Sequence, residues 1–238
     1  MAEPMYRRIL LKLSGEILAG DKGFGIDPGK ASYLANEVKS VYELGISIGL
    51  IIGAGNIFRG IDASSRGMDR VTGDYLGMLA TIMNAIAVQD ALEKIDCETR
   101  TLSAINVSQI AEPYIRRRAI RHLEKGRVVI ISGGTGNPFF TTDSAAALRA
   151  KELGADVVLK GTKVNGVYDK DPMEFDDAKK FNKISFSQVL KDNLRVMDLT
   201  AITLCKENNL PIQVFNINHQ GDLKQLVQGA KIGTLVSE

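Results

Sequence analysis

The chain has 238 residues, of which 45% are hydrophobic, enough to build one large α/β domain. Lys and Arg together number 30 against 28 Asp and Glu, which gives a net charge of +2. This near balance lacks the basic surface of a nucleic-acid-binding protein, so no nucleic-acid partner is required. The densest basic cluster, Arg116-Arg117-Arg118 with Arg121, falls on an amphipathic helix and is interpreted as a solvated or subunit-contact face.

Strand-like apolar runs alternate with helix-like amphipathic segments along the chain, which predicts βα units in a mainly parallel sheet. We expect strands at 8–13, 47–52, 98–102, 127–131, 156–160, 212–215 and 234–236. We expect helices at 28–44, 73–95, 113–125, 144–153, 187–191, 196–208 and 221–228. Between them, residues 162–186 have the composition of turns and a charged loop. The predicted fold class is therefore α/β.

Cysteine usage favours a reducing compartment. Cys97 and Cys205 are far apart in the sequence and match neither a disulfide framework nor a metal-binding spacing. Residues 1–6 are short and polar, unlike a signal peptide, and no apolar stretch approaches the length of a membrane span. We therefore expect a cytoplasmic protein that needs no membrane.

Several apolar strands run into glycine-rich segments. The longest is 132–143, Ser-Gly-Gly-Thr-Gly-Asn-Pro-Phe-Phe-Thr-Thr-Asp, which follows a buried strand and precedes a helix. Glycines let backbone N–H groups close on a phosphate, and the helix N-terminus adds the positive end of its dipole. The same layout recurs at 14–16, 53–60 and 161–163. Such loops on one sheet predict a site that holds more than one phosphorylated molecule.

The common nucleotide-binding fingerprints are absent from the sequence. Residues 25–31 are one residue short of a P-loop and lack its Ser or Thr for magnesium. The segment that begins at Gly53 has Phe58 where a dinucleotide fingerprint needs its third glycine. Phosphate binding would therefore use another scaffold.

Three cations are candidates for binding phosphate. Lys12 and Lys160 each end an apolar strand, where burial is costly unless the ammonium group reaches a partner at the carboxyl edge of the sheet. If both strands are central and parallel, the two lysines converge on one crevice; otherwise each is an edge lysine that extends into solvent. Arg59 either binds phosphate bidentately or is an exposed arginine of a glycine-rich loop.

Three aspartates stand at or near the starts of predicted helices, where a carboxylate commonly caps the helix N-terminus. Asp74 could instead accept hydrogen bonds from ribose hydroxyls, and Asp143 has the same two interpretations. Asp198 either caps its helix or orients the two lysines. His122 and His219 fall on predicted surface helices and receive no catalytic role. The sequence has no Ser-His-Asp or zinc constellation.

Six motifs in this order resemble the bacterial-type uridylate kinase (UMP kinase) family of the amino-acid kinase superfamily, over essentially the whole chain. They are Lys12-Leu-Ser-Gly-Glu16, Gly20-Asp-Lys-Gly-Phe-Gly25, Asn56-Ile-Phe-Arg-Gly60, Thr135-Gly-Asn-Pro-Phe-Phe-Thr-Thr-Asp143, Val157-Val-Leu-Lys160 and Val196-Met-Asp-Leu199. The resemblance implies one domain over 1–238, a three-layer α/β/α sandwich around a mainly parallel central sheet. It also implies a homohexamer that transfers the γ-phosphoryl group of ATP to UMP. Mg²⁺ would bind mainly to nucleotide phosphates, so no protein metal site is expected.

The resemblance also assigns site residues. The ATP site would comprise Lys12, Leu13, Ser14, Gly15, Gly55, Arg59, Thr162, Asn165, Tyr168 and Asp171. The UMP site would comprise Ala54, Asp74, Thr135, Gly136, Asn137, Pro138, Phe139, Phe140, Thr141 and Thr142. Activation by GTP would involve Gly20, Asp21, Lys22, Gly23, Phe24 and Gly25, and UTP would inhibit. Ala54 departs from the family's usual glycine, so its contact with UMP would be through the backbone.

The mechanistic hypothesis is direct in-line phosphoryl transfer without a phosphoenzyme. Lys12, Lys160 and Arg59 would neutralise charge on the transferring group, and Asp198 would hold the lysines. Two alternatives remain. A kinase of the same fold could act on an amino acid or a carbamate, although Asp74 would repel a carboxylate. A non-catalytic homologue could bind nucleotide or an oxyanion, although retention of both lysines with Asp198 argues against it.

Overall fold

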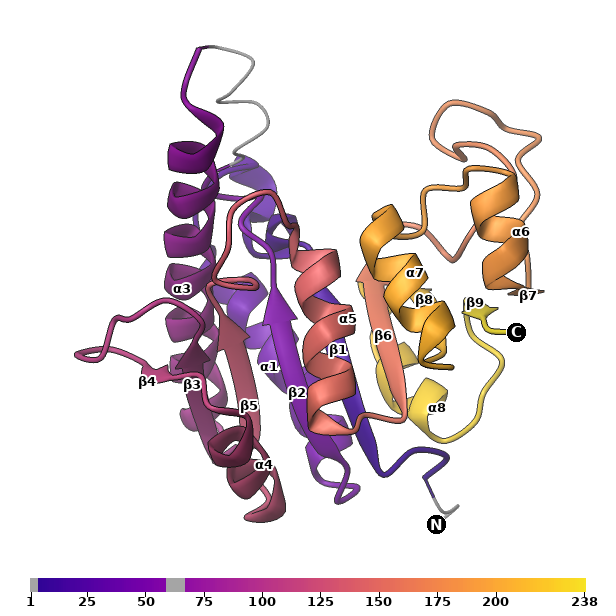
Figure 1. Cartoon of the computed structure of the whole chain (residues 1–238). Helices are drawn as coiled ribbons and strands as arrows, with labels where there is room; N and C mark the ends of the chain where they lie inside the picture. The colour runs from indigo at the N-terminus through magenta and orange to yellow at the C-terminus, as the bar shows by residue number, and fades with distance from the viewer. Residues whose placement is uncertain (1–3, 59–66) are drawn as a thin grey trace.

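The computed structural model describes residues 4–58 and 67–238. Within these residues one nine-stranded sheet has the order β4-β3-β5-β2-β1-β6-β8-β9-β7 (Figure 1). The strands are β1 Arg8–Leu13, β2 Ser47–Ile52, β3 Thr99–Ser103, β4 Glu112–Pro113, β5 Val128–Ser132, β6 Val157–Thr162, β7 Lys183–Ile184, β8 Ile212–Asn216 and β9 Thr234–Val236. Only the β8–β9 pairing is antiparallel among these strands. The prediction of a mainly parallel sheet is confirmed.

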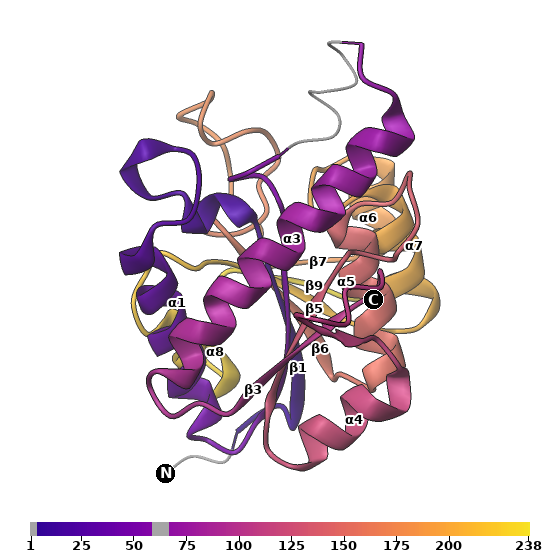
Figure 2. The same cartoon turned by 90° about the vertical axis from the view of Figure 1, so that its left-hand side faces the viewer.

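Helices cover both faces of this sheet, which confirms the three-layer α/β/α architecture. One face packs against α1 Pro28–Tyr42, α3 Arg70–Glu93 and α8 Asp222–Val227 (Figure 2). The other face packs against α4 Arg116–Glu124, α5 Thr142–Leu153, α6 Phe186–Lys191 and α7 Leu199–Glu207. Each face has its own apolar core, because successive residues of a buried strand point to opposite sides.

The first strand shows how this alternation places a charge. Leu11 and Leu13 pack into the core beneath α1 and α3, whereas Leu10 packs into the core beneath α5. Lys12 is two residues beyond Leu10, so it points to the α5 face. The residue is only 7% exposed, because the strand lies at the centre of the sheet between β2 and β6. The strand pattern thus forces an ammonium group into a covered position.

Helix boundaries follow their caps. The carboxylate of Asp27 accepts from the backbone N–H of Lys30 at 2.9 Å, and Pro28 is the first residue of α1, as predicted. Helix α5 begins two residues earlier than predicted, because Thr141 caps it. Gly154 ends it at φ 67, a left-handed conformation that suits glycine.

Short elements account for most of the differences from prediction. Helix α4 begins at Arg116 and not at Pro113, because Glu112–Pro113 pairs with β3 as the edge strand β4. Two 3₁₀ helices, η1 Gly15–Leu18 and η2 Gly20–Lys22, and the two-residue strand β7 were not predicted. Each is too short to produce a hydrophobic period that differs from that of a turn.

Helix α3 departs from the expectation that no apolar stretch approaches the length of a membrane span. Among the described residues it is the single helix that is long and apolar enough, by length and composition, to cross a membrane. A core helix of a soluble protein passes the same test. Helix α3 lies across the sheet (Figure 2), and Ala85, Val88 and Leu92 belong to the core that it forms with the sheet.

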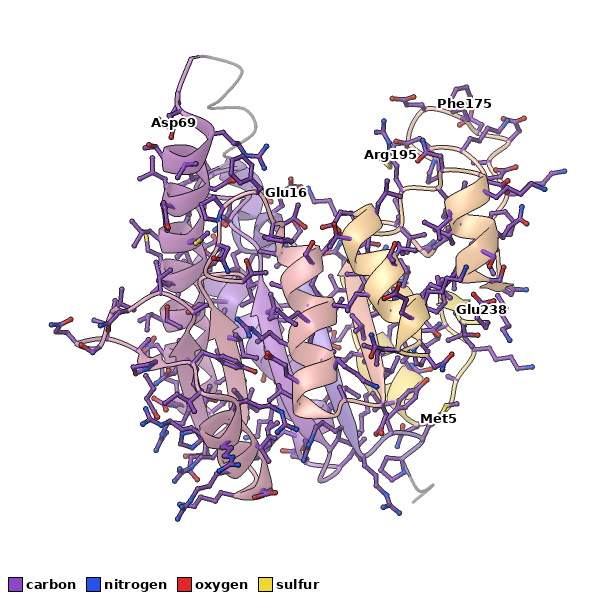
Figure 3. All side chains as sticks on the ribbon, in the orientation of Figure 1. Met5, Glu16, Asp69, Phe175, Arg195 and Glu238 are labelled. Carbon is purple, nitrogen blue, oxygen red and sulfur yellow. The ribbon has the colours of Figure 1, made fainter. Side chains whose placement is uncertain are left out.

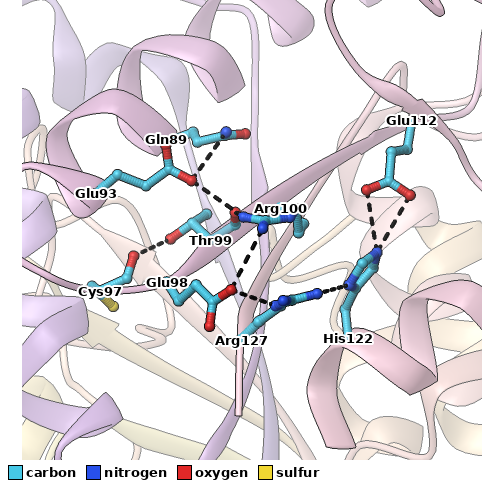
Figure 4. Close-up of polar contacts among 9 residues, drawn as sticks. All are labelled: Gln89, Glu93, Cys97, Glu98, Thr99, Arg100, Glu112, His122 and Arg127. Carbon is cyan, nitrogen blue, oxygen red and sulfur yellow. Dashed lines mark hydrogen bonds and ion pairs between the residues drawn. The ribbon is translucent and has the colours of Figure 1, made fainter. Parts of the chain in front are cut away.

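A polar network ties the amino ends of β3 and β5 to α3 and α4 (Figure 4). Arg127 donates from Nε to Glu98 at 2.8 Å and lies 3.1 Å from His122 Nδ1. On the other side of its ring, His122 Nε2 contacts the carboxylate of Glu112 at 3.2 Å. This position at the amino ends of the strands gives His122 a structural role. His219, predicted on a helix, lies in the turn before α8.

Candidate active site

The carboxyl ends of β1, β2, β5 and β6 lie at one edge of the sheet, the upper edge in Figure 1. Each of these strands runs into one of the glycine-rich segments singled out above. Open α/β sheets bind ligands at this edge. Glu16 and Arg195, labelled in Figure 3, both lie there, one after β1 and the other before α7.

A cavity of about 350 Å³ lies between α3, the residues after β2 and the 133–141 loop, and we call it the α3 cavity. The predicted residues in its lining are Ala54, Gly55, Asp74, Thr135, Asn137, Phe140, Thr141 and Thr142. The lining also contains Phe58, Gly73, Gly77, Met78, Thr81 and Gly134, which the sequence argument missed. Gly73, Gly77 and Thr81 recur every fourth residue on one face of α3, so this run of small side chains could have located the wall. Gly136, Pro138 and Phe139 belong to the same loop but are not part of this lining.

Asp74 orders the wall of the α3 cavity as well as lining it. It is not the cap of α3, because Asp69 accepts from the Thr72 backbone N–H at 2.9 Å. Both oxygens of Asp74 accept from Arg70 Nε at 2.9 Å, and one also accepts from the backbone N–H of Phe139 at 2.7 Å. Phe139 has φ 71, an uncommon backbone conformation for a residue with a side chain. The contact therefore holds the loop in a strained shape.

Thr81 provides a second anchor between α3 and the same loop. Its hydroxyl accepts from the backbone N–H of Gly133 at 2.8 Å and donates to the Met78 carbonyl at 2.6 Å. The side chain is buried, so both hydrogen bonds are shielded from water. The beginning of the 133–141 loop is therefore fixed to the helix.

Two lysines converge on the N-terminus of α5. Lys12 and Lys160 are register partners on the adjacent parallel strands β1 and β6, so their side chains lie beside each other. Lys12 Nζ lies 2.5 Å from one oxygen of Asp143, and Lys160 Nζ donates to the other at 3.0 Å. Lys160 also donates to the Val196 carbonyl at 2.5 Å. Convergence of the two lysines, expected for central parallel strands, is confirmed.

The charges of this cluster are strongly coupled. Burial would raise the pKa of Asp143, but Lys12 and Lys160 together outweigh it and hold that pKa below its ordinary value. Burial lowers the pKa of Lys160; Asp143 opposes this shift and Lys12 adds to it. Two lysines share the carboxylate of Asp143, and Asp198 acts on Lys160 only through its charge. The two ammonium groups at the edge of the sheet can attract a further anion.

The carboxylate that holds the two lysines is Asp143, whereas the sequence argument gave this role to Asp198. Asp198 caps α7 by accepting from the backbone N–H of Ala201 at 2.8 Å. It also accepts from the hydroxyls of Ser144, at 2.8 Å, and Thr141. Asp198 thus ties the N-terminus of α5 to that of α7. It acts on Lys160 through its charge alone, which opposes the lowering of the Lys160 pKa by burial.

A second cavity, of about 610 Å³, lies on the other side of this cluster, and we call it the β6 cavity. Its lining contains the predicted Lys160, Thr162, Tyr168 and Asp171, together with the unpredicted Arg195. Asn165 is not in this lining. Its side-chain oxygen accepts from Asn216 at 3.0 Å instead.

The lysine cluster separates the two cavities. Lys160 lies in the wall of the β6 cavity, and Thr142, which directly precedes Asp143, lies in the wall of the α3 cavity. Both cavities therefore border the cluster, one through Lys160 and the other through the residue before Asp143. This arrangement suits transfer of an anionic group between two bound molecules.

The remaining predicted residues flank this centre. Leu13 is fully buried at the end of β1, and Ser14 caps η1. A Cβ on Gly15 would lie 2.4 Å from the Gly53 carbonyl, so only glycine fits where the two loops meet. Arg59 lies outside the described residues, and its phosphate contact stays a prediction.

The predicted effector segment, Gly20–Gly25, consists of η2 and a turn. Phe24 at its tip is 68% exposed, and the backbone N–H of Gly25 donates to the Asn56 carbonyl at 2.8 Å. A cavity of about 250 Å³ beside it is lined by Ser14, Glu16, Ile17, Gly20, Asp21, Lys30, Gly161, Lys163, Ile217 and Asn218. The segment therefore borders the loop that follows β1.

A family model described as the amino acid kinase family matches residues 7–216, which include every element of the lysine cluster and both cavities. The chain belongs to the amino acid kinase family. Within this family its similarity to solved structures is extensive. A UMP kinase from Bacillus anthracis is 39% identical with a TM-score of 0.94, over 98% of this chain and 96% of the other.

Two further solved structures agree with the family assignment. A UMP kinase from Ureaplasma parvum is 38% identical with a TM-score of 0.91, over 98% of this chain and 99% of the other. A uridylate kinase from Archaeoglobus fulgidus is 26% identical with a TM-score of 0.74, over 96% and 99%. The amino acid kinase fold of this chain is thus matched over nearly its whole length.

Replacing Asp143 with asparagine in this amino acid kinase should cost about 3 kcal/mol of unfolding free energy at pH 7, because two buried ammonium groups lose their counter-charge. The pKa of Asp143 is lowered on folding, so its contribution is present above the unfolded-state pKa of about 4 and is lost as pH falls through the folded-state value. The difference in unfolding free energy between wild type and Asp143→Asn should therefore become smaller below pH 4. Urea unfolding at pH 7, 5, 4 and 3 measures this.

The matched control is Asp90→Asn, which removes an exposed carboxylate paired with Lys94 at 2.6 Å. Its effect should stay within about 0.5 kcal/mol at every pH, as expected for a surface pair. A loss for Asp143→Asn that is as large at pH 3 as at pH 7 would contradict the electrostatic role of Asp143.

Proposed function

We propose that this protein is a nucleoside monophosphate kinase that transfers the γ-phosphoryl group of ATP to UMP, giving UDP and ADP for pyrimidine nucleotide synthesis. The observation that carries the proposal is the pair of lysines, Lys12 and Lys160, held by the carboxylate of Asp143 between two cavities. The 39% identity to a UMP kinase over 98% of the chain supports UMP as the acceptor. We treat residues 1–238 as one catalytic domain.

The α3 cavity is the proposed UMP site. Its polar groups come from Asp74, Thr135 and Asn137, and the ring of Phe140 supplies an apolar wall. Residues 135–142 would then bind the nucleoside, with Ala54 contacting it through the backbone. The structure changes one argument against an amino-acid acceptor: Arg70 compensates the charge of Asp74, so repulsion of a carboxylate is weaker than the sequence suggested. The choice of UMP over an amino acid as the acceptor therefore depends more on the similarity to UMP kinases.

The β6 cavity is the proposed ATP site. Tyr168 offers a ring for the adenine, and Thr162 and Asp171 offer polar groups for the rest of the nucleoside. The phosphates would extend toward Lys160 and toward the loop of Lys12–Gly15. We keep Asn165, Gly55 and Arg59 as proposed contacts of ATP.

The proposed chemistry is in-line transfer between the two cavities. A phosphate oxygen of UMP is already anionic at neutral pH, so it can attack without a strong general base. Lys12 and Lys160 neutralise charge on the transferring group, because they point at the edge where the cavities approach each other. Asp143 keeps their ammonium groups together, and Asp198 fixes the two helix N-termini around them.

Mg²⁺ is the proposed cofactor, carried by the nucleotide. In the described part of the chain no three Asp, Glu, His or Cys side chains are grouped so that they could hold a metal ion. Both oxygens of Asp143 already face lysines. These donors therefore suit a metal bound to phosphates and water, which would neutralise phosphate charge, rather than a resident metal centre.

We further propose a cytoplasmic homohexamer activated by GTP and inhibited by UTP. Exposed apolar side chains on α3 support self-association, since Tyr75, Leu76, Leu79 and Met83 are 37–55% exposed on one side of the helix. A second copy of the chain is the proposed occupant of this face. The Gly20–Gly25 segment is the proposed region of GTP activation, because it borders the loop after β1.

A coupled assay of ADP release with MgATP tests the substrate. UMP, CMP, dUMP, aspartate, glutamate and carbamate are compared, each alone, with GTP and with UTP. We expect turnover with UMP, raised by GTP and lowered by UTP. Turnover on an amino acid would leave the family assignment unchanged and show that the proposed acceptor is wrong. Nucleotide binding without any turnover would make the protein a binding protein and contradict the proposed activity.

Lys12→Ala tests the transition-state role of the cluster. We expect kcat to fall by about 10²–10³-fold, because a preorganised charge is removed from the transferring group. The KM for UMP should change much less, since the lysine contributes little to binding the acceptor. Lys94→Ala, which removes an exposed lysine that pairs with Asp90 of α3, is the control. A loss confined to UMP affinity would show that Lys12 acts in binding alone.

Light scattering after size-exclusion chromatography tests the assembly. The wild type should have six times the chain mass of 25.9 kDa. Leu79→Glu places a charge on the exposed apolar side of α3, so it should dissociate the hexamer into smaller species. Met173→Glu, at an 81% exposed loop position, should leave the mass unchanged. A wild-type monomer, or a hexamer unaffected by Leu79→Glu, would contradict the proposed interface.

A further inference from the structure

Two buried asparagines form a closed amide pair behind the glycine loops. Asn84 on α3 is 0% exposed, and Asn56, just after β2, is 1% exposed. The side-chain NH₂ of each donates to the side-chain oxygen of the other, at 2.7 Å and 2.9 Å. Buried amides are costly unless every polar atom has a partner, so such a pair needs a reason.

The second N–H of each amide goes to a backbone carbonyl. Asn84 donates to the carbonyl of Gly53 at 2.7 Å, and Asn56 donates to that of Gly25 at 2.7 Å. A carbonyl can only accept, so these two contacts fix which end of each amide carries the NH₂ group. All four N–H donors of the pair are therefore used. A fully satisfied buried network is rigid.

The pair supports the loops that face the lysine cluster. A Cβ on Gly15 would lie 2.4 Å from the side-chain oxygen of Asn56, so the loop after β1 rests directly on the pair. Gly53 donates its N–H to the Leu13 carbonyl at 2.9 Å, and a Cβ on it would lie 3.4 Å from the hydroxyl of Thr142. The loops after β1 and β2 and the N-terminus of α5 are thus packed together at this point.

Helix α3 serves as a common frame for these loops. Asn84 lies three residues after Thr81, which holds the Gly133 backbone N–H, so the two buried polar side chains are neighbours on the helix. One holds the loop of the α3 cavity and the other holds the loop after β2. The spacing between these loops is therefore set by hydrogen bonds to a single helix.

We propose that Asn84 and Asn56 are positioning residues for phosphoryl transfer, which hold the Gly15 and Gly53 backbones at the spacing that the transferring group requires. This rests on the proposed kinase function. Neither asparagine lines the α3 cavity or the β6 cavity, so the pair acts through the two glycine loops. Its contact with the Gly25 carbonyl also couples the Gly20–Gly25 segment to the same loops.

The test variant is Asn84→Asp, which keeps the shape of the side chain and replaces two N–H donors by an acceptor. The Gly53 carbonyl and the Asn56 oxygen would then face an oxygen, so the loops should move apart. We expect kcat to fall about 10²-fold, as for misplacement by about 1 Å, with a KM for UMP within threefold of wild type. Burial among acceptors raises the pKa of the introduced carboxyl, so it should protonate as pH falls from 8 to 6 and supply one O–H donor in place of the two N–H donors that were lost. The kcat relative to wild type should recover in part over that range.

The matched control is Asn36→Asp on α1. Asn36 is exposed and donates to the Ser32 carbonyl at 2.8 Å, so the control makes the same chemical change away from the loops. Its kcat and pH profile should follow those of the wild type. A folded Asn84→Asp variant with wild-type kcat, or with a loss that does not depend on pH, would overturn the proposal.

A second variant and a second measurement cover failure of the first variant to fold. Asn84→Ser introduces no charge but cannot reach the Gly53 carbonyl, so it should also lower kcat, without recovery at low pH. Hydrogen exchange of peptides covering residues 13–16 and 53–56 needs no substrate and should be faster in either variant than in wild type. Unchanged exchange there would overturn the positioning role. Absence of wild-type turnover on UMP, with faster exchange in the variants, would overturn only the proposed function.

Discussion

The structure depends on one carboxylate shared by two ammonium groups. Lys12 and Lys160 are direct neighbours on central strands, and two covered like charges at that spacing would repel each other. Asp143, in the first turn of α5, forms an ion pair with each lysine and offsets their mutual repulsion. The helix N-terminus adds a positive dipole end, which stabilises the carboxylate further. Asp198 adds a second negative charge, which acts on Lys160 without contacting it, and the cavities on either side are arranged around this cluster.

Helix α3 provides the second constraint. It lies across the face of the sheet opposite α5, so it cannot touch the lysines directly, yet it fixes the backbone that surrounds them. Thr81 holds the start of the 133–141 loop, Asp74 holds its middle through Phe139, and Asn84 holds the loop after β2. The small residues Gly73 and Gly77 leave the space that becomes the α3 cavity. One helix therefore supplies both the room for a ligand and the rigidity of the loops that meet it.

The sequence predicted the fold well, because hydrophobic period and helix caps are local signals. The strands β1, β2, β5 and β6, which carry the site, and the cap of α1 at Asp27 follow from residues within a few positions of one another. The site was predicted less completely. Asp143 and Asp198 both stand at helix starts, and only the three-dimensional path decides which helix N-terminus lies above β1 and β6. Sequence spacing cannot show that path, so the role given to Asp198 belongs to Asp143.

Asn84 was missed for a similar reason. The role of a polar residue in an apolar helix can be recognised only when its partner, here the Gly53 carbonyl, is known.

The side chains of the described residues also bear on whether the transfer is direct. A covalent phosphoenzyme needs a nucleophile at the centre, and the candidates there are poor. Burial raises the pKa of Cys205, near Asp143, to about 12, so its thiol stays protonated. Cys97 lies in the core on the other face of the sheet, and burial raises its pKa to about 11. His122 lies among Glu112 and Arg127 at the amino ends of the strands, away from both cavities. Asp143 is tied to two lysines whose attraction lowers its pKa and with it its basicity. The cluster is therefore suited to neutralising charge between two bound molecules, which agrees with the direct transfer proposed above.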